Sequence, residues 1–389
     1  MSWIRPDPIG MDTSPAPLPG GTTGPPEALP SVRPSRRRPG PDVVRALAMF
    51  GVVVMNYHGY LIIRGAPRDG GVLYDVFDPW TGPLSTRFAT LFVLTAGVGV
   101  SLMTASSIGD PERTRAMRWR LARRGLVLYG VGLAFDMIWA GTILPYYGAM
   151  FVLAAVLYTW RARWLILTGV LAAVAGWALR WWRLERDLDG RDTSWLTNPP
   201  GSSPRGLLFD VFVNGTHPLL PWLAFFCAGI VLGRILHTDW WRAACAGCGL
   251  ALFSIAAIVG PAAAGSADAR VRTLLSDDPF ERGLVYVAST LGSALVAFAA
   301  ISWVADRFED STVIDVLRRA GQLSLTIYLA HALVFNLLVD WLDVVAPDGV
   351  GTALAFATIV WLCSIAGAVA YQQRFGRGPA ERVYRALTA

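Results

Sequence analysis

The chain alternates between long apolar runs and short clusters of arginine, and this alternation limits its possible folds more than any other feature. A run of about 20 apolar residues is long enough to cross the hydrocarbon core of a bilayer as a helix. Inside lipid the backbone has to satisfy its own hydrogen bonds, so such runs become helical. Only 16% of the residues are charged, whereas a soluble domain usually carries about 25%. We therefore predict an all-α fold, a polytopic integral membrane helix bundle.

The hydropathy pattern predicts about 10 transmembrane helices. They lie at residues 43–63, 84–105, 123–141, 146–160, 164–181, 218–236, 243–262, 284–305, 322–341 and 351–372.

The distribution of arginine predicts the orientation, because loops on the cytoplasmic side carry an excess of positive charge. The arginine-rich segments that we assign to the cytoplasm contain Arg36–Arg38, Arg113–Arg124, Arg161 and Arg163, Arg234 and Arg242, Arg307 to Arg319, and Arg374–Arg385. The opposite loops, 64–83, 182–217, 263–283 and 342–350, mix arginine with many acidic residues. An even number of spans then places both termini in the cytoplasm.

The pattern divides the chain into three parts. Residues 1–41 hold 11 of the 25 prolines and few apolar clusters, so we predict a disordered cytoplasmic tail. The transmembrane domain follows at residues 42–373, and residues 374–389 form a cytoplasmic C-terminal tail. The cluster Arg36–Arg38 before the first span indicates an uncleaved signal anchor, with a twin-arginine export signal as the alternative.

Composition also excludes some functions. The net charge of +6 comes from arginines placed between apolar spans, which is topogenic and argues against nucleic-acid binding. The four histidines are scattered over different segments, so we expect no metal site. Cys245 and Cys248 form a C-x-x-C inside an apolar run. Small residues at this spacing are more typical of close helix packing than of a redox or metal site.

Polar residues inside apolar spans are costly and therefore informative. In the first span, Asp42, Arg45 and Asn56 fall on one helical face at about 100° per residue. His58 lies 13 residues after Arg45, roughly 20 Å further along a helix. A continuous helix would point His58 away from the Arg45 face. Either the helix ends before His58, or this residue faces a different neighbour.

The ninth span carries Ser324, Tyr328 and His331 at spacings i, i+4 and i+7, which places them on one helical face. His331 is expected near the middle of the membrane. It is either a structural group bonded to a backbone carbonyl or a functional residue. His217 lies at the external mouth of the sixth span, and His237 is expected to be solvated in the cytoplasm.

Several stretches, in order along the chain, resemble a known group of membrane proteins. The first two spans, with PDVVRALAMFGVVVMNY and RFATLFVLTAGVGVSLM, are similar to the heparan-alpha-glucosaminide N-acetyltransferase-like family and its bacterial YeiB-like relatives. HPLLPWLAFFCAGIVLGR and the tail FGRGPAERVYRALT resemble the YeiB-like pattern. GQLSLTIYLAHALVF is similar to a late helix of bacterial acyltransferases that modify surface polysaccharides.

The resemblance implies a transmembrane acyltransferase of the bacterial plasma membrane. It would move an acyl or acetyl group from cytoplasmic acyl-CoA, such as acetyl-CoA, to a glycan or lipid acceptor outside, without a metal. The chain departs from the pattern in three places. Asn56 stands where polysaccharide acyltransferases place a histidine, and Thr142 stands where YeiB-like chains often carry an acidic residue. His58 is the one histidine near the first external loop, where the heparan enzymes use one.

In this interpretation, Arg45 and the Arg113–Arg124 loop hold the CoA phosphates. The alternative for Arg45 is a topogenic charge paired with Asp42. The pantetheine arm passes Ser324, Tyr328 and His331. His58 acts as general base or carries the acyl group briefly, while Asn56 orients the thioester carbonyl.

Two other functions fit the same pattern. A transporter or flippase without covalent chemistry would also combine many spans with polar groups at the midplane, although the sequence shows no convincing internal repeat. A scaffold or sensor subunit of the cell envelope is the third possibility. A homo-oligomer is also compatible with the sequence.

Overall fold

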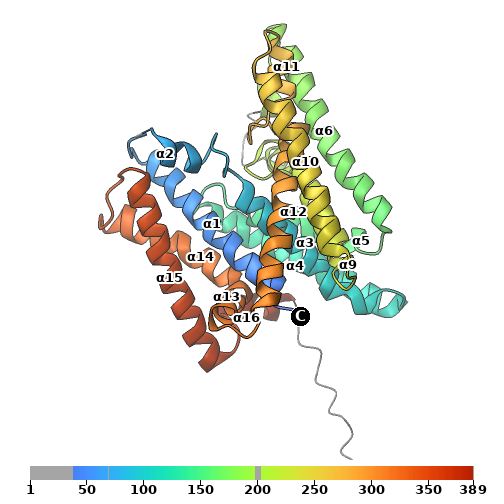
Figure 1. Ribbon diagram of the computed structural model, residues 1–389, viewed down its shortest axis with the longest axis vertical. Helices are drawn as coiled ribbons and strands as arrows, with labels where there is room; N and C mark the ends of the chain where they lie inside the picture. Colours follow the sequence, from blue (N-terminus) through green and yellow to red (C-terminus); the bar gives the residue numbers. More distant parts are fainter. Residues whose placement is uncertain (1–37, 69, 198–202, 389) are drawn as a thin grey trace, which may run out of the picture. The chain divides into compact units, whose positions relative to one another are not determined.

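The computed structural model describes residues 38–68, 70–197 and 203–388, which form one compact unit built from helices, without a strand among these residues (Figure 1). Nearly all of the predicted tail 1–41 lies outside the described residues. The longer helices are α1 (Gly40–Ile63), α3 (Arg87–Thr104), α4 (Pro111–Asp136), α5 (Leu144–Leu157), α6 (Ala162–Leu188), α9 (Leu219–Ile235), α10 (Trp241–Ala264), α12 (Leu284–Arg307), α13 (Thr312–Gln322), α14 (Ser324–Phe335), α15 (Val350–Phe375) and α16 (Pro379–Thr388).

Short helices connect these long ones. They are α2 (Val72–Phe77), α7 (Ser194–Thr197), α8 (Pro204–Phe209) and α11 (Ala269–Leu274), together with the single-turn segments η1 (Ala105–Ser107), η2 (Asp210–Asn214) and η3 (Asn336–Trp341).

The expected membrane helix bundle is confirmed. Within the described residues, seven helices are long and apolar enough to cross a membrane, or eight if the bent pair Pro204–Asn214 and Leu219–Ile235 forms one span. The remaining two predicted spans fall on α5, which is a shorter apolar helix, and on the second half of α4, whose first half carries the arginines. The total of ten and the orientation stay predictions.

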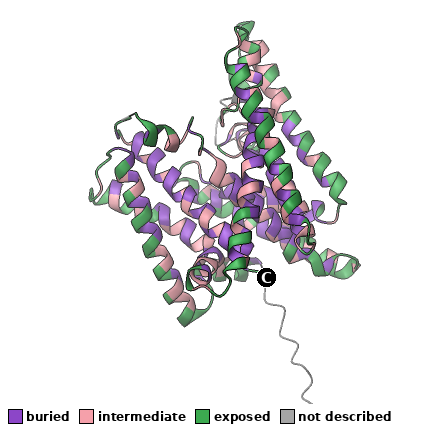
Figure 2. Cartoon of the chain, in the orientation of Figure 1, coloured by how far each residue is buried: buried purple, intermediate pink, exposed green. Residues whose placement is uncertain are grey.

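Helix α1 lies at the centre of the bundle and packs against α3, α12, α13, α14 and α15. In its most apolar stretch 67% of the residues are buried, compared with 22% in α6 and in α10. Figure 2 shows the same contrast, with buried residues along α1 and exposed ones along the outer faces of α6 and α10. The apolar residues exposed on α6 and α10 suit contact with lipid, whereas α1 is enclosed by protein.

Glycines allow the closest helix contacts in the bundle. Gly97 of α3 faces Gly229 of α9, and a Cβ atom on Gly229 would collide with the carbonyl oxygen of Leu94. The α10–α12 contact uses Gly249 in the same way, and the thiol of Cys245 donates to the Leu295 carbonyl across it at 3.3 Å. Small residues let transmembrane backbones approach closely, so Cys245 lies in a helix-packing contact of the kind expected from its spacing.

The C-terminal segment folds back on the bundle instead of leaving it. Helix α16 packs against α4 and α14. The Glu381 carboxylate accepts hydrogen bonds from the backbone N–H groups of Leu325 (2.9 Å) and Thr326 (3.1 Å). These groups belong to the first turn of α14, where backbone donors have no partner within the helix. Glu381 therefore caps the helix that carries Tyr328 and His331.

Candidate functional site

One face of α1 carries the polar residues predicted from its periodicity. At the start of the helix, the Arg45 guanidinium contacts the Asp42 carboxylate at 3.4 Å. The same carboxylate accepts a hydrogen bond from the Gln322 side chain at 3.1 Å. Asp42 is 2% exposed, so a partner for its charge is required. The pairing expected between Asp42 and Arg45 is thus present.

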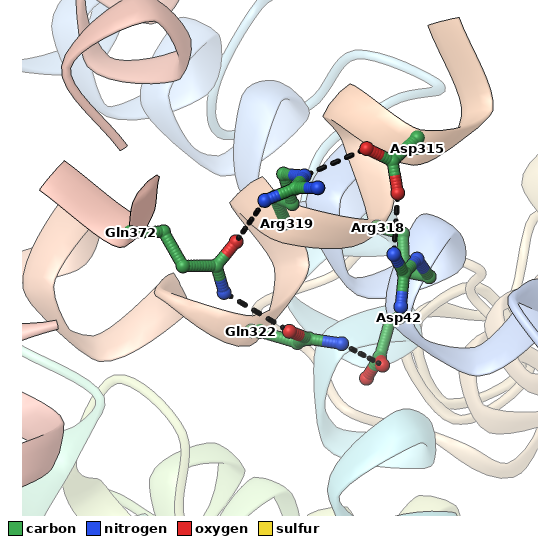
Figure 3. Close-up of polar contacts among 6 residues, drawn as sticks. All are labelled: Asp42, Asp315, Arg318, Arg319, Gln322 and Gln372. Carbon is green, nitrogen blue, oxygen red and sulfur yellow. Dashed lines mark hydrogen bonds and ion pairs between the residues drawn. The ribbon is translucent and has the colours of Figure 1, made fainter. Parts of the chain in front are cut away.

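The contacts of Asp42 continue into a polar network that joins α1, α13 and α15 (Figure 3). Gln372 of α15 donates to the Gln322 side-chain oxygen at 3.1 Å and accepts from Arg319 at 3.4 Å. Arg319 also pairs with Asp315 at 2.7 Å. The network fixes the start of α1 against two neighbouring helices, so the Asp42 end of α1 is rigidly held.

A cavity of about 270 Å³ lies along the other half of the same α1 face. We call it the Asn56 cavity. Asn56 and Ile63 of α1, Phe92 of α3 and Tyr328 of α14 line it, together with His217 from the segment that precedes α9. Arg45 and Asn56 are 11 residues apart on one helix face, which corresponds to about 16 Å along the axis. The charged end and the cavity therefore lie at two levels of one α1 face, with the apolar residues Met49 and Val52 between them.

Asn56 is held by His331. The amide nitrogen of Asn56 lies 3.3 Å from Nε2 of His331. Nδ1 of the same ring faces the Tyr328 carbonyl, so Nδ1 carries the proton and Nε2 accepts from Asn56. Among the described residues the Asn56 side chain has no other hydrogen-bond partner. One amide N–H and the amide oxygen are left for a molecule in the cavity.

His331 itself is fully buried and does not line the cavity. Its ring stacks on Tyr57 at 6.0 Å and meets the edge of Trp139 at 5.4 Å. Tyr57 also donates to the His331 carbonyl at 2.8 Å. His331 is bonded to a backbone carbonyl, as one of its two predicted roles requires. Because it also holds Asn56, its position serves the cavity indirectly.

Tyr328 lies in the cavity wall and is fixed by the connection between α4 and α5. Its hydroxyl is 2.9 Å from the Thr142 hydroxyl and accepts from the Ile143 backbone N–H at 3.1 Å. Thr142 is thus the direct partner of Tyr328. The third residue of the predicted face, Ser324, is half-buried at the start of α14 and does not line the cavity.

His58 faces a different neighbour from Asn56. Helix α1 continues to Ile63, so the ring turns toward α2, where Nδ1 contacts the Phe77 carbonyl at 2.8 Å and Tyr74 packs edge-on at 5.4 Å. The side chain is 1% exposed, and its Nε2 has no hydrogen-bond partner among the described residues. The structure therefore brings Asn56, Tyr328 and His331 together, and places His58, Arg45 and Ser324 outside the cavity wall.

Two further residues belong to this region, although the sequence assigned them no role. His217 lines the cavity, with its ring 4.5 Å from Trp222 and its Nδ1 2.9 Å from the Thr216 hydroxyl. The hydroxyl of Tyr147 in α5 is buried without a partner among the described residues, within electrostatic reach of Arg45 and Tyr328. The position of His217 at a span end was the one available signal. No sequence signal pointed to Tyr147.

A comparison with models of known protein families shows which family the chain belongs to. The model of the heparan-alpha-glucosaminide N-acetyltransferase catalytic domain matches residues 37–263, more than half of the chain. The chain belongs to this family. A second family model, protein of unknown function (DUF418), matches residues 249–389. The resemblance to heparan-alpha-glucosaminide N-acetyltransferase and YeiB-like proteins is thus confirmed. A search of curated proteins finds no match.

The two matches meet inside one helix. Residues 249–263, which both family models cover, lie within α10. The acetyltransferase match includes Asn56 and His217, whereas Tyr328 and His331 fall in the other match. The Asn56 cavity is therefore built by both matched regions of a chain whose family is one of transmembrane acetyltransferases.

Proposed function

We propose that the protein transfers an acyl group, such as acetyl, from cytoplasmic acyl-CoA to a glycan or lipid acceptor on the other side of the membrane. The observation that supports this most is the α1 face that carries both Arg45 and Asn56. It runs from Arg45 to a cavity whose inner wall presents an oriented Asn56 amide. Membership of an acetyltransferase family favours this function over a transporter or flippase.

The free amide N–H of Asn56 suits a thioester carbonyl. As the acceptor oxygen or nitrogen attacks the carbonyl carbon, negative charge develops on the carbonyl oxygen, and a fixed donor lowers the energy of that state. The new bond to carbon forms while the carbon–sulfur bond breaks, and CoA leaves as a thiolate. The acceptor's proton passes to a base, from which the thiolate takes it. His331 serves as a positioning residue because it holds the Asn56 side chain.

Two histidines are candidates for the base. The sequence predicts His58, whose buried Nε2 has no partner among the described residues but which lies on the α2 side of the helix. Of the described residues that line the Asn56 cavity, His217 is the one histidine. A base has to reach the proton that it removes, so the geometry favours His217, and His58 remains the candidate derived from the sequence.

On the donor side, we propose that Arg45 contacts the CoA phosphates from the Asp42 end of α1. The guanidinium lies against Gly99, where a Cβ atom would be 3.3 Å from it, and its pairing with Asp42 is a single contact at 3.4 Å. An arginine fork has further donors to offer a phosphate. The acyl chain and pantetheine arm then extend past Ser324 and Tyr328 toward Asn56.

Transfer across a sealed membrane tests this function. Proteoliposomes receive radiolabelled acetyl-CoA on the Arg45 side, with amine or hydroxyl acceptors enclosed on the other side. We expect label on the acceptor, and we expect acetyl-CoA to raise the unfolding temperature of the detergent-purified protein more than CoA-free acetate does. Acceptor movement without acetylation, and no thermal response to acetyl-CoA, would instead indicate a transporter.

A further inference from the structure

A second, smaller cavity of about 170 Å³ adjoins the Asn56 cavity. Phe280 lines both cavities. The other walls come from the end of α6, from residues 213 and 220 around the bend that precedes α9, and from residues 281–282 before α12. We call it the arginine cavity, because Arg180, Arg183 and Arg282 line it together with one acidic residue, Glu281.

The positive charge of the arginine cavity is only partly neutralised. Arg180 forms an ion pair with Glu281. Arg282 donates to the backbone carbonyls of Val213 (3.0 Å) and Gly215 (2.7 Å), which carry no charge. Three arginines and one glutamate line the cavity, so the lining carries two more positive than negative charges, with Asp187 and Asp210 acting on Arg183 and Arg282 from outside it.

Arg183 has no direct partner. Its guanidinium makes no hydrogen bond and no ion pair within the described residues, although Asp187 and Glu281 attract it from a greater distance. The Nε atoms of Arg183 and Arg180 are both buried without an acceptor among the described residues. Buried donors in native proteins are nearly always satisfied, and leaving a charged one unsatisfied is costly. The protein therefore leaves part of the charge at this end of α6 without a direct partner.

Arg282 is held in a backbone conformation with φ of +56°, in the left-handed region that non-glycine residues seldom adopt. Burial lowers the pKa of this arginine, which reflects the cost of enclosing its charge. An anion beside it would offset that cost. The loop thus holds a guanidinium in place beside a cavity without supplying a carboxylate to pair with it.

We propose that the arginine cavity binds an oxyanion, a phosphate, sulfate or carboxylate group, of the acceptor molecule. The proposal rests on the proposed function and specifies its substrate class as an acidic acceptor. The cavity is smaller than the 300–1,000 Å³ typical of whole-ligand pockets, so it accepts one group of a larger molecule. Guanidinium forks match tetrahedral and planar oxyanions. With its acidic group here, the rest of the acceptor extends past Phe280 toward Asn56.

Inorganic phosphate tests the site without any transfer chemistry. The full chain in detergent is titrated with phosphate at constant ionic strength, with chloride as the reference, and its unfolding temperature is followed. We expect a saturable rise in the wild type that is lost in Arg183→Gln, reduced in Arg183→Lys and retained in Arg191→Gln, an exposed arginine on a nearby loop. An equal phosphate response in the wild type and in both Arg183 variants would overturn the proposal. The lysine variant keeps the positive charge, so it still tests the site if the glutamine variant does not fold.

Acceptor choice supplies the second readout. Glucosamine, glucosamine 6-phosphate and phosphatidylethanolamine are compared as acetyl acceptors, because they separate a free amino sugar from a sugar phosphate and from a lipid phosphate. We expect at least one phosphate-bearing acceptor to have the lower KM, and Arg183→Gln to reduce the ratio of KM values between neutral and acidic acceptors by about tenfold. An unchanged ratio would contradict the proposal. If no acceptor is acetylated, the proposed function fails, and the phosphate titration still decides whether the anion site exists.

Discussion

At the scale of single residues, the site depends on how one amide is oriented. Asn56 has two N–H donors, and His331 engages one of them from a ring whose other nitrogen faces the Tyr328 carbonyl. This arrangement leaves the second donor in a fixed direction. A fixed donor needs no reorganisation when charge develops on a substrate oxygen, so its effect is larger on the rate of transfer than on binding.

Replacing Asn56 by alanine removes that donor. We expect kcat for acetyl transfer to fall about 10²- to 10³-fold, because the carbonyl oxygen loses its partner in the transition state. Binding of acetyl-CoA, followed by the rise in unfolding temperature, is expected to remain. A fall in acetyl-CoA affinity with an unchanged kcat would assign Asn56 to donor binding instead.

Single alanine substitutions of the histidines separate the two candidate bases. We expect His217→Ala to lower transfer by about 10²- to 10⁴-fold, since His217 lines the Asn56 cavity, and His58→Ala to have the smaller effect. Initial rates with saturating acetyl-CoA provide the measurement, and His237→Ala, an exposed histidine, is the matched control. Loss of transfer in His58→Ala alone would return the role to His58, as the sequence predicts.

At the scale of helices, polar contacts at the ends of elements fix the helices that carry the site. Glu381 caps α14 from α16, and the network around Asp42 ties α1 to α13 and α15. Both sets of contacts lie away from the Asn56 cavity. Loss of these contacts is therefore expected to lower the stability of the protein and to loosen the positions of the site residues. It would not remove a group that takes part in the chemistry.

Glu381→Ala leaves two backbone donors of α14 without a partner. We expect a loss of about 0.5–2 kcal/mol in stability, the range typical of a lost helix cap. Thermal unfolding of the purified protein in detergent measures it. Glu309→Ala, at an exposed glutamate without a hydrogen bond in the described structure, controls for the loss of one negative charge. Equal unfolding temperatures of the two variants would rule out a capping role.

Because of Asp315, the stability of the polar network around Asp42 should depend on pH. Hydrogen bonds from Arg318 and Arg319 hold the pKa of this carboxyl below its ordinary value of 3.8. A carboxyl whose pKa is lowered by folding stabilises the folded state at pH values above its ordinary pKa. This contribution disappears as the pH falls through the lowered pKa. Asp315→Asn should therefore be less stable than the wild type at pH 6, and the gap in unfolding temperature should shrink below pH 4. A gap independent of pH would contradict this account.

At the scale of the whole molecule, the sequence predicts the features that local periodicity determines. Apolar length gives the helices, and the 3.6-residue repeat gives the shared face of Asp42, Arg45 and Asn56. Because α1 continues past His58, the same repeat also places His58 on a different face from Arg45 and Asn56. Contacts between distant segments have no such local signal. Thr142 meets Tyr328 across 186 positions of the chain, and the approach of His217 to the cavity depends on the bend before α9.

Orientation in the membrane is a prediction for the entire chain. In a variant without the exposed cysteines Cys248 and Cys363, we expect a cysteine at Ala346 to react with an impermeant maleimide added to intact cells. A cysteine at Glu112 should react only after the membrane is permeabilised, because its segment is rich in arginine. The reverse labelling pattern would invert the proposed path from donor to acceptor.

The cap on α14 links the site to the order in which the ribosome makes the chain. Helix α16 emerges after every other helix of the described residues, so until it is translated and docked, the first turn of α14 has no carboxylate at its donors. A nascent chain can insert all its spans and still hold Tyr328 and His331 on a frayed helix. Messages truncated shortly before codon 381 would thus yield inserted but inactive protein.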